Sequence, residues 1–331
     1  ERDLKSKVEA KWPERRVISW RVQAPFPDRV PPGIAAALRT GRLTIRTNAV
    51  VSHITTDSTS GLATGAVFVD RESKREDRVF ADVVVVCGST IESIRLLLNS
   101  GSSKHPNGLG NSSGLLGHYF ANLGTEPEAG FLRGISFQGL GGRFPTPPGA
   151  PAPLGLGGAG EMLARFDNNI SLGRRKDRWG VPIPRIDISM GDNDRLLLER
   201  SMTALREMAD LCGYRVNFIG SAAGLESSKV WPDFTPLQRQ IFKQGIKMSL
   251  VLGAAIHECG GARMGTDPKR SVMNHMNQLW DAPNVFVPDA SSFVSGSTVG
   301  PALTVMAMAA RTSAFIAEQH GTGWSAQSHA V

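Results

Sequence analysis

Residues 81–101 read ADVVVVCGSTIESIRLLLNSG, and this stretch decides the fold class that the sequence predicts. Four consecutive valines, residues 83–86, are typical of a strand buried on both faces, as in a parallel sheet covered by helices. Gly88 ends the strand, and Ser89 followed by Glu92 has the spacing of a capping box. Strand, glycine turn and helix together indicate half of a doubly wound nucleotide-binding unit. One face of the helix is apolar, through Ile91, Ile94, Leu97 and Leu98.

The neighbouring segments predict a mixed α/β chain. Residues 43–88 are rich in strand formers, and residues 72–77 fall where a turn would join two hairpin arms. Residues 101–182 hold much of the glycine and proline, so we expect long surface excursions there, with the glycine run at 155–160 in a loop. Residues 182–190 alternate in hydropathy as a strand does.

Start and stop signals mark further elements in the second half of the chain. Residues 284–293 predict a short buried strand that ends in an aspartate, and Gly213 is a stop signal for the helix before it. The expected helix starts are Asp192 or Asn193, Thr235–Pro236, and Gly300–Pro301.

Length and hydropathy bound the class of protein. With 331 residues, of which 41% are hydrophobic, the chain can bury a sizeable core, which we expect to be divided into two lobes. No apolar run reaches the roughly 18 residues of a membrane helix, so we expect no membrane span. The first residue is Glu1 and no signal segment follows it, so we interpret the chain as a processed or truncated product, cytoplasmic or periplasmic.

Charge and cysteine content disfavour two classes of protein. The net charge is +7, and the basic residues are scattered except at residues 174–178. A nucleic-acid groove would interleave such charge with aromatic residues, so a solvated basic surface is favoured and no nucleic-acid partner is expected. Cys87, Cys212 and Cys259 lie far apart, which argues against a disulfide framework or a zinc ribbon.

Residues 254–268, AAIHECGGARMGTDP, set a histidine in a glycine-rich turn. Three interpretations stand: a metal site, a structural loop, or a catalytic base held over a cofactor. A metal site is disfavoured because His257 and Cys259 supply only two ligands, so no metal is expected. A catalytic base needs a side chain that takes up a proton near neutral pH, which is the property of histidine.

Two features downstream of His257 could complete a ligand site. Asp289, at the carboxyl end of the expected strand, would either lie in the crevice where open α/β sheets bind ligands or cap the next segment. The helix that starts at Pro301 has free amide donors and a partial positive charge at its first turn, which would stabilise an anion. Gly300 and Ala302 are small enough to let a ring approach the backbone, although the apolar residues of this helix fit core packing equally well.

Three stretches near the C-terminus resemble, in order and spacing, the signature of the glucose–methanol–choline (GMC) flavoprotein oxidoreductases. They are HECGGARMGTDPKRSV from residue 257, NVFVPDASSF from residue 284 and GPALTVMAMAARTSAFI from residue 300. Residues 37–120 resemble the family's second FAD-contacting segment and the region after it. The likeness is greatest to the bacterial branch of sugar and glycoside dehydrogenases and the gluconate dehydrogenase large subunit. It implies FAD as cofactor, a small alcohol or sugar as substrate, and an electron acceptor that the sequence does not identify.

The family's functional positions carry over one by one. His257 falls where the family places its active-site histidine, the base for the substrate hydroxyl. The positions that match cofactor contacts are Val51, whose backbone faces the adenine, Cys87 and Gly88 beside the adenosine, Asp289 and Ala290 at the pyrophosphate and ribityl chain, and Gly300, Pro301 and Ala302 at the flavin pyrimidine edge.

Three departures from the family pattern affect the expected activity. No GxGxxG strand–turn–helix occurs, and residues 155–160 have the wrong spacing for one, so we expect the N-terminal FAD segment to be absent. The family's second catalytic residue, asparagine or histidine, is Gly300 here, and losing one such donor costs on the order of 10²–10³ in rate. The threonine that usually follows His-x-x-Gly is Gly261.

The predicted architecture is α/β, with a partial doubly wound FAD-binding domain (residues 1–110 and 255–331) and an antiparallel-sheet-plus-helices substrate domain (residues 111–254). The expected reaction oxidises an alcohol group of a sugar, glycoside or polyol by hydride transfer to flavin N5, with His257 as base. The alternative is an inactive or truncated homologue that acts as a binding or assembly subunit, or that complements a separate FAD-binding chain through an unpaired strand edge.

Overall fold

The computed structural model describes residues 2–14, 17, 30–121, 134–141, 154–216, 218–221, 224–227, 235–249, 252–253, 257–296 and 298–319. The helices are α1 (Arg2–Lys11), α2 (Pro32–Arg39), α3 (Thr90–Asn99), α4 (Asp192–Leu211), α5 (Pro236–Ser249) and α6 (Ala302–Gln319), with a 3₁₀ turn η1 (Ala290–Ser292). The strands are β1 (Ala49–Thr56), β2 (Ala63–Asp70), β3 (Glu76–Phe80), β4 (Val84–Val85), β5 (Ile135–Gly141), β6 (Leu154–Gly160), β7 (Asn169–Lys176), β8 (Pro182–Asp187), β9 (Phe218–Ser221), β10 (Gly224–Ser227) and β11 (Val285–Phe286).

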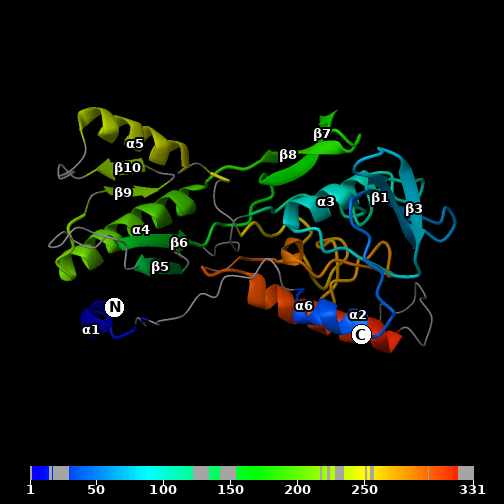
Figure 1. Ribbon diagram of the computed structural model, residues 1–331, viewed down its shortest axis with the longest axis horizontal. Helices are drawn as coiled ribbons and strands as arrows, with labels where there is room; N and C mark the ends of the chain where they lie inside the picture. Colours follow the sequence, from blue (N-terminus) through cyan, green and yellow to red (C-terminus); the bar gives the residue numbers. More distant parts are fainter. Residues whose placement is uncertain are drawn as a thin grey trace.

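These elements form two groups joined by a hairpin (Figure 1). One group holds α3 with β1 and β3, and the other holds α4 and α5 with β5, β6, β9 and β10. The β7–β8 hairpin lies between them and contacts α3. All strand pairs are antiparallel except β4 with β11, so the architecture is mixed α/β, as the sequence predicts.

The predicted hairpin near the N-terminal end is confirmed as part of a three-stranded meander, β1–β2–β3. Its second turn closes because the Asp70 carboxylate accepts hydrogen bonds from the Ser73 backbone N–H at 2.8 Å and the Ser73 hydroxyl at 2.8 Å. Strand β1 carries a bulge: Val51 pairs with Phe68 but His53 with Val67, which leaves one residue between them unpaired. Bulges re-aim backbone groups and occur often beside functional sites.

The strand expected from the four valines is shorter and less buried than the sequence predicts. Only Val84 and Val85 form β4, which pairs in parallel with β11, and the Val85 side chain is 48% exposed. Burial on both faces was therefore wrong for Val85, because β11 is its only strand neighbour in the described part of the chain. Val86, which is 4% exposed, does reach the core.

Helix α3 forms as predicted, but the capping box at its start was wrong. Ser89 has a left-handed φ of 70° and its side chain makes no capping hydrogen bond. Glu92 instead pairs with Arg95, one turn further on, at 3.0 Å. The predicted apolar face is confirmed at Ile94 and Leu97, which are fully buried.

The main core lies under α3 and draws on segments far apart in the sequence. Its members come from β1 and β2, from α3, from the loop at 109–120, from β7, and from residues 262–287. The largest fully buried apolar side chains of this cluster are Ile94, Leu97, Leu109, Ile170, Met273 and Leu279. The core therefore joins the glycine-rich turn around His257 to the nucleotide-binding half that residues 81–101 predict.

The glycine run at 155–160 was wrongly expected to lie in a loop, because it forms most of strand β6. Neighbouring side chains occupy the space above its glycines. A Cβ on Gly160 would lie 2.7 Å from Leu197 Cδ2 of α4, and one on Gly158 would lie 3.1 Å from Phe137 Cε1 of β5. Glycine in this strand thus allows close packing of α4 and β5, which local sequence patterns do not reveal.

All three helices expected in the second half are present, as α4, α5 and α6. Helix α4 begins after Gly191, whose N–H donates to Asp194 Oδ2 at 2.7 Å, so the cap lies one residue before the predicted Asp192 or Asn193. At α5, Thr235 and Gln238 exchange hydrogen bonds of 2.9 and 3.3 Å, a reciprocal cap just before the predicted Pro236 start.

The β7–β8 hairpin is tied to α3 by one arginine. Arg95 donates to Asp177 Oδ2 at 2.6 Å, and its Nε donates to the Pro182 carbonyl at 2.6 Å. Its side chain is 12% exposed and that of Asp177 is 17% exposed. This partly buried ion pair connects the hairpin to the core helix.

Candidate functional site

His257 begins a loop that is held by hydrogen bonds from three different elements. The buried Thr90 hydroxyl at the start of α3 donates to the Glu258 carbonyl at 2.6 Å. Cys259 and Ala121 exchange backbone hydrogen bonds of 2.8 and 2.9 Å, and Gly260 N–H donates to the Ala290 carbonyl at 2.9 Å. His257 itself has a left-handed φ of 87°, an unusual conformation for a residue with a side chain. Such backbone strain often occurs at functional sites.

The imidazole of His257 lies against Gly300, just before α6. A Cβ on Gly300 would lie 3.2 Å from His257 Nε2 and 3.5 Å from Cε1. The helix begins directly afterwards, because the Val305 N–H donates to the Pro301 carbonyl at 2.9 Å. Two regions more than forty residues apart, each expected to belong to one site, therefore meet at the histidine ring.

Asp289 caps the turn that comes after it. Its Oδ1 accepts from the Ser291 N–H at 2.9 Å and from the Ser291 hydroxyl at 2.6 Å, and its Oδ2 accepts from the Ser93 hydroxyl at 2.5 Å. The carboxylate is buried, with 6% of the residue exposed. Of the two roles predicted for Asp289, capping of the next segment is confirmed. A contact with cofactor hydroxyls stays a prediction.

Ser93 connects Asp289 to the turn after β4. Its hydroxyl oxygen accepts from the Gly88 N–H at 3.0 Å while the hydroxyl donates to Asp289. Desolvation by surrounding protein raises the pKa of the neighbouring Cys87 thiol, and the negative charge of Asp289 raises it further. The thiol is therefore kept protonated, which disfavours nucleophilic chemistry at Cys87.

The sequence-predicted site residues are thus linked in one region, with one exception. Hydrogen bonds and contacts run from Gly88 through Asp289 and Ala290 to the His257 loop and on to Gly300 and Pro301. Val51 joins only indirectly: the Asn99 side chain at the end of α3 donates to the Ser52 carbonyl beside it at 2.7 Å.

The sequence analysis did not predict two residues that connect the site, Thr90 and Ser93. Ser93 lies on the buried side of α3, where it is 0% exposed, one residue before Ile94. A polar residue beside the apolar face of an amphipathic helix is the signal that could have found it. Thr90 gave no such signal, because its partner carbonyl lies 168 residues away.

Gly261 is a glycine for reasons of packing. Its φ is +88°, and a Cβ there would lie 2.3 Å from Ile94 Cδ1. The residue is buried, so the threonine usual in the family would require the Ile94 side chain to shift.

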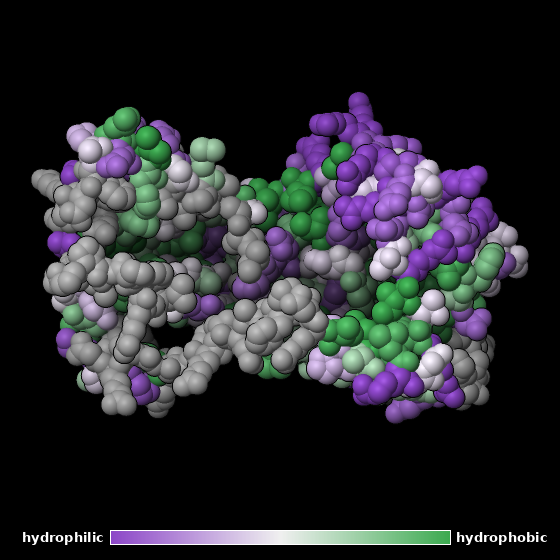
Figure 2. Space-filling view, in the orientation of Figure 1, coloured by the Kyte–Doolittle hydropathy of each residue, from purple (hydrophilic) through white to green (hydrophobic). Residues whose placement is uncertain are grey.

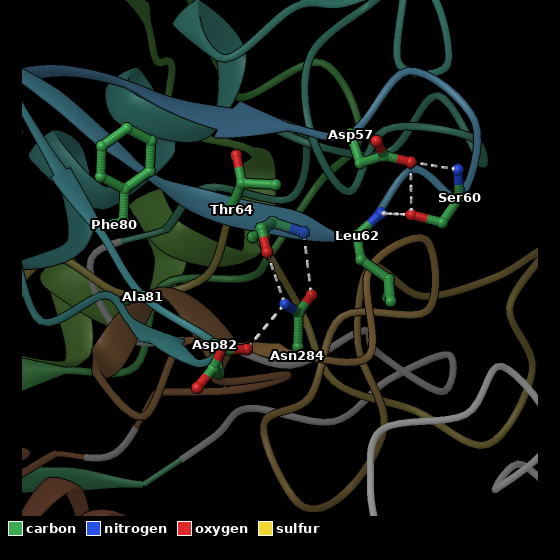
Figure 3. Close-up of a pocket in the computed structure, with 9 residues that line it drawn as sticks. Asp57, Ser60, Leu62, Thr64, Phe80, Ala81, Asp82 and Asn284 are labelled. Atoms are coloured by element: carbon green, nitrogen blue, oxygen red, sulfur yellow. Dashed lines mark hydrogen bonds between the residues drawn. The ribbon is translucent and has the colours of Figure 1, made fainter.

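A hollow of about 630 Å³, lined by polar and apolar residues alike, lies between the β1–β2 turn, the end of β3 and Asn284 (Figure 3). Asn284 closes its floor: its side chain donates to the Ala63 and Asp82 carbonyls and accepts from the Ala63 N–H. Phe80 and Asp57 lie at its rim. None of the nine lining residues is a predicted catalytic or cofactor residue, so this hollow carries no part of the site.

Two further features are absent from the described ranges. No group of three or more histidine, cysteine, aspartate or glutamate side chains is placed there to hold a metal ion. Within the same ranges, no helix has the length and apolar character needed to cross a bilayer.

The stretch that carries this geometry matches a known family. Residues 164–309, which include His257, Asp289 and Gly300, match the model of the GMC oxidoreductases. This part of the chain is a GMC oxidoreductase C-terminal region. Members of the family are FAD-dependent and act on CH–OH donors.

Curated GMC relatives resemble most of this chain at low identity. It is 27% identical over 330 residues to a 2-methyl-1,2-propanediol dehydrogenase from Mycolicibacterium austroafricanum, with 83% of this chain and 54% of the relative covered. It is 25% identical over 338 residues to a gluconate 2-dehydrogenase flavoprotein from Pantoea cypripedii, with 83% and 51% covered. The chain therefore spans about half the length of the curated relatives it matches.

A solved GMC-like structure supports the fold. The model resembles a formate oxidase from Aspergillus oryzae RIB40 with a TM-score of 0.53, at 14% sequence identity. The match covers 83% of this chain and 60% of that one. At this identity the likeness concerns the fold alone.

Proposed function

We propose that this chain provides the C-terminal portion of an FAD-dependent oxidoreductase that oxidises an alcohol group of a sugar, glycoside or polyol. The observation that carries the proposal is the contact of the His257 ring with Gly300 at the start of α6, inside the GMC-matched region.

The exposed side of the site fits a flavin. Val85 and Cys87 at the end of β4 are exposed, and so are Ala302 and Leu303 in the first turn of α6. The amide groups of that turn have no carbonyl before them in the helix, so they would hold an electron-rich ring edge. Asp289 would act by holding the turn between these surfaces, because its carboxylate is already bonded to Ser93 and Ser291.

His257 is the proposed base for the substrate hydroxyl. When bound, FAD supplies the acceptor for the hydride that leaves the alcohol carbon. Nε2 of His257 would take the hydroxyl proton, because it is the ring nitrogen closest to Gly300 and the α6 terminus. Loss of the proton and of the hydride leaves a carbonyl product, so the reaction balances. A base that must be unprotonated predicts a rate that rises with pH.

We also propose that the FAD-binding part comprises residues 1–110 and 255–331, and the substrate part residues 111–254. Packing of α4 on β6 and β9 supports a separate second unit. Leu116, Phe120 and Ile170, however, belong to the core under α3, which favours a boundary later than residue 111.

A second candidate is a subunit that does not turn over by itself. It would serve as a binding or assembly subunit, or would complement a separate FAD-binding chain. The five exposed residues of β3, at the edge of its sheet, support this candidate. Unpaired strand edges invite pairing with another chain.

Flavin retention and flavin reduction, measured on the same samples, test the proposal. The chain is purified with added FAD, desalted, and mixed without oxygen with sugars, glycosides and polyols, while visible flavin absorbance is followed. His257→Ala should keep its flavin and bleach on the order of 10² times more slowly than wild type. His275→Ala, at an exposed histidine, is the matched control and should bleach as wild type does.

Each outcome distinguishes the candidates. Equal bleaching by His257→Ala and wild type would remove His257 from the base role. A protein that stays colourless with FAD present would favour the subunit that depends on another chain.

A further inference from the structure

Three positive charges from two distant segments surround the ring of Trp179. Arg178 Cζ lies 4.2 Å, Lys74 Nζ 5.1 Å and Arg71 Cζ 5.9 Å from the ring centroid. Arg71 and Lys74 lie in the β2–β3 turn, whereas Arg178 lies in the β7–β8 turn, about a hundred residues later. The Trp179 Nε1–H donates to the Arg71 carbonyl at 3.4 Å and so links the two turns. We name these four residues the Trp179 cluster.

Within the described residues, the three cations of the Trp179 cluster make no ion pair with a carboxylate. Asp177, next to Arg178, is turned inward and is bonded to Arg95 at 2.6 Å. Asp70 and Glu72 flank Arg71; the Asp70 carboxylate accepts from the Ser73 N–H and hydroxyl, each at 2.8 Å, and Glu72 is exposed. Exposed positive charge continues along β7 through Arg174, Arg175 and Lys176. Figure 2 shows hydrophilic side chains gathered over this end of the molecule, above the elements that Figure 1 labels β7 and β3. Folding has therefore brought together, from two turns and β7, a surface on which exposed basic side chains outnumber exposed acidic ones.

The aromatic ring fixes how these cations are presented. A guanidinium held over an aromatic ring keeps its N–H groups at the edge, where they match a carboxylate. Arg178 and Arg71 are both exposed, so those edges face solvent. Arginines ordered in this way lose less side-chain freedom on binding than free ones do.

We propose that the Trp179 cluster is a docking surface for an acidic protein, whose aspartate and glutamate side chains pair with Arg71, Lys74 and Arg178. A single-stranded nucleic acid fits less well, because it needs open aromatic faces for stacking and cations already lie over Trp179. A membrane surface fits less well too, because the indole N–H already donates to the Arg71 carbonyl. None of the four residues of the Trp179 cluster is a residue of the His257 site, so this inference does not depend on the proposed reaction.

Binding to poly-L-glutamate tests the proposal, with heparin and vesicles containing anionic phospholipid as the competing arms. The wild-type chain should bind poly-L-glutamate, and the triple variant Arg71→Ser, Lys74→Ser, Arg178→Ser should bind at least about tenfold more weakly. The control triple variant, Arg39→Ser, Arg42→Ser, Lys104→Ser, removes two arginines and one lysine from exposed positions elsewhere and should bind as wild type does. The single variant Arg178→Ser should give a smaller loss in the same direction, and circular dichroism verifies that every variant is folded.

Three results would overturn the proposal. The first is an equal loss of affinity in the two triple variants, which would make net charge the cause. The second is binding of wild type to heparin or vesicles through the cluster but not to poly-L-glutamate, and the third is binding to none of the three probes. A loss of affinity for poly-L-glutamate in the Trp179-cluster variant, without a loss in the control variant, supports the proposal.

Discussion

Replacing Arg95 by methionine tests how the β7–β8 hairpin is held on the core. The guanidinium bonds the Asp177 carboxylate at 2.6 Å and the carbonyls of Pro182 and Val181 at 2.6 and 3.1 Å, and it pairs with Glu92 at 3.0 Å. Methionine keeps an unbranched apolar stem but removes every donor. The Asp177 carboxylate then loses the one cation that pairs with it within the described residues, while it stays mostly covered by protein.

The expected cost is about 2 kcal/mol in the free energy of unfolding. Breaking a fully buried pair costs about 3–5 kcal/mol, and an exposed pair contributes about 0–1 kcal/mol. The Arg95–Asp177 pair lies between these cases, because the two side chains are 12% and 17% exposed. Asp177 also keeps hydrogen bonds from the Trp179 and Val181 N–H groups at 2.9 and 3.1 Å.

The cost should depend on pH in a defined direction. Burial acts to raise the pKa of Asp177, but hydrogen bonds from Arg95, Trp179 and Val181 outweigh it and hold the pKa below 3.8. A carboxyl with a lowered folded-state pKa stabilises the fold above its unfolded pKa and loses that contribution as the pH falls through the folded value. The difference in free energy of unfolding between wild type and Arg95→Met should therefore be largest near neutral pH and should shrink in acid below about pH 4.

Urea unfolding, followed by circular dichroism at several pH values, measures the change in the free energy of unfolding that Arg95→Met causes. The control is Arg185→Met, because the Arg185–Asp187 pair has a similar length, 2.8 Å, but side chains that are 69% and 45% exposed. It should change stability by no more than about 0.5 kcal/mol. If Arg95→Met costs no more than Arg185→Met at neutral pH, or if its cost does not shrink in acid, the reasoning is refuted.

Three further substitutions probe the candidate site. Asp289→Ala should cost about 2 kcal/mol in thermal unfolding because three donors lose their acceptor, and Asp289→Asn should recover part of it; equal losses would mean that the bonds do not matter. Gly261→Thr should cost about 2 kcal/mol or more, because Gly261 has a φ of +88° and a Cβ there would lie 2.3 Å from Ile94 Cδ1; unchanged stability would contradict this packing. Gly300→Ala should shift the imidazole NMR signals of His257, whereas Gly245→Ala, in open space, should leave them in place; no shift with either variant would separate Gly300 from the ring.

Elements with local signals could be predicted from the sequence. The apolar spacing of α3 places Ile94 and Leu97 in the core, and the Thr235–Pro236 pair marks the start of α5. Both signals act within one or two turns of chain, where the residues that decide the outcome are neighbours in sequence. The contact of His257 with Gly300 could be anticipated only through the family resemblance, because no local pattern connects the two positions.

Elements decided by distant partners could not be predicted. The glycine run of β6 is a strand because its backbone pairs with β5, and Leu197 and Phe137, which pack against its glycines, do not lie near it in sequence. Asp289 becomes a cap partly through Ser93, which is 196 residues away. Val85 is exposed although it sits in a run of valines, because β4 has one strand neighbour in the described ranges.

Two glycines beside His257 fix the position of its ring against Gly300. A Cβ on Gly260 would lie 2.4 Å from the Tyr119 carbonyl oxygen, and one on Gly261 would lie 2.3 Å from Ile94. These close approaches bring the loop against the core and fix the backbone on which the ring is carried. The imidazole then occupies the space that a side chain at position 300 would need, because a Cβ on Gly300 would lie 3.2 Å from His257 Nε2.

The residue at position 300 therefore affects the position of the His257 ring as well as the supply of a hydrogen-bond donor. A side chain added at position 300 alone brings a new donor and also displaces the base, so the two effects oppose each other in a rate measurement. Comparing Gly300→Ala with Gly300→Asn separates them, because both add the Cβ and only the second adds an amide. If asparagine restores turnover that alanine lowers, the donor matters; if both lower it equally, the place of the ring decides the activity of this site.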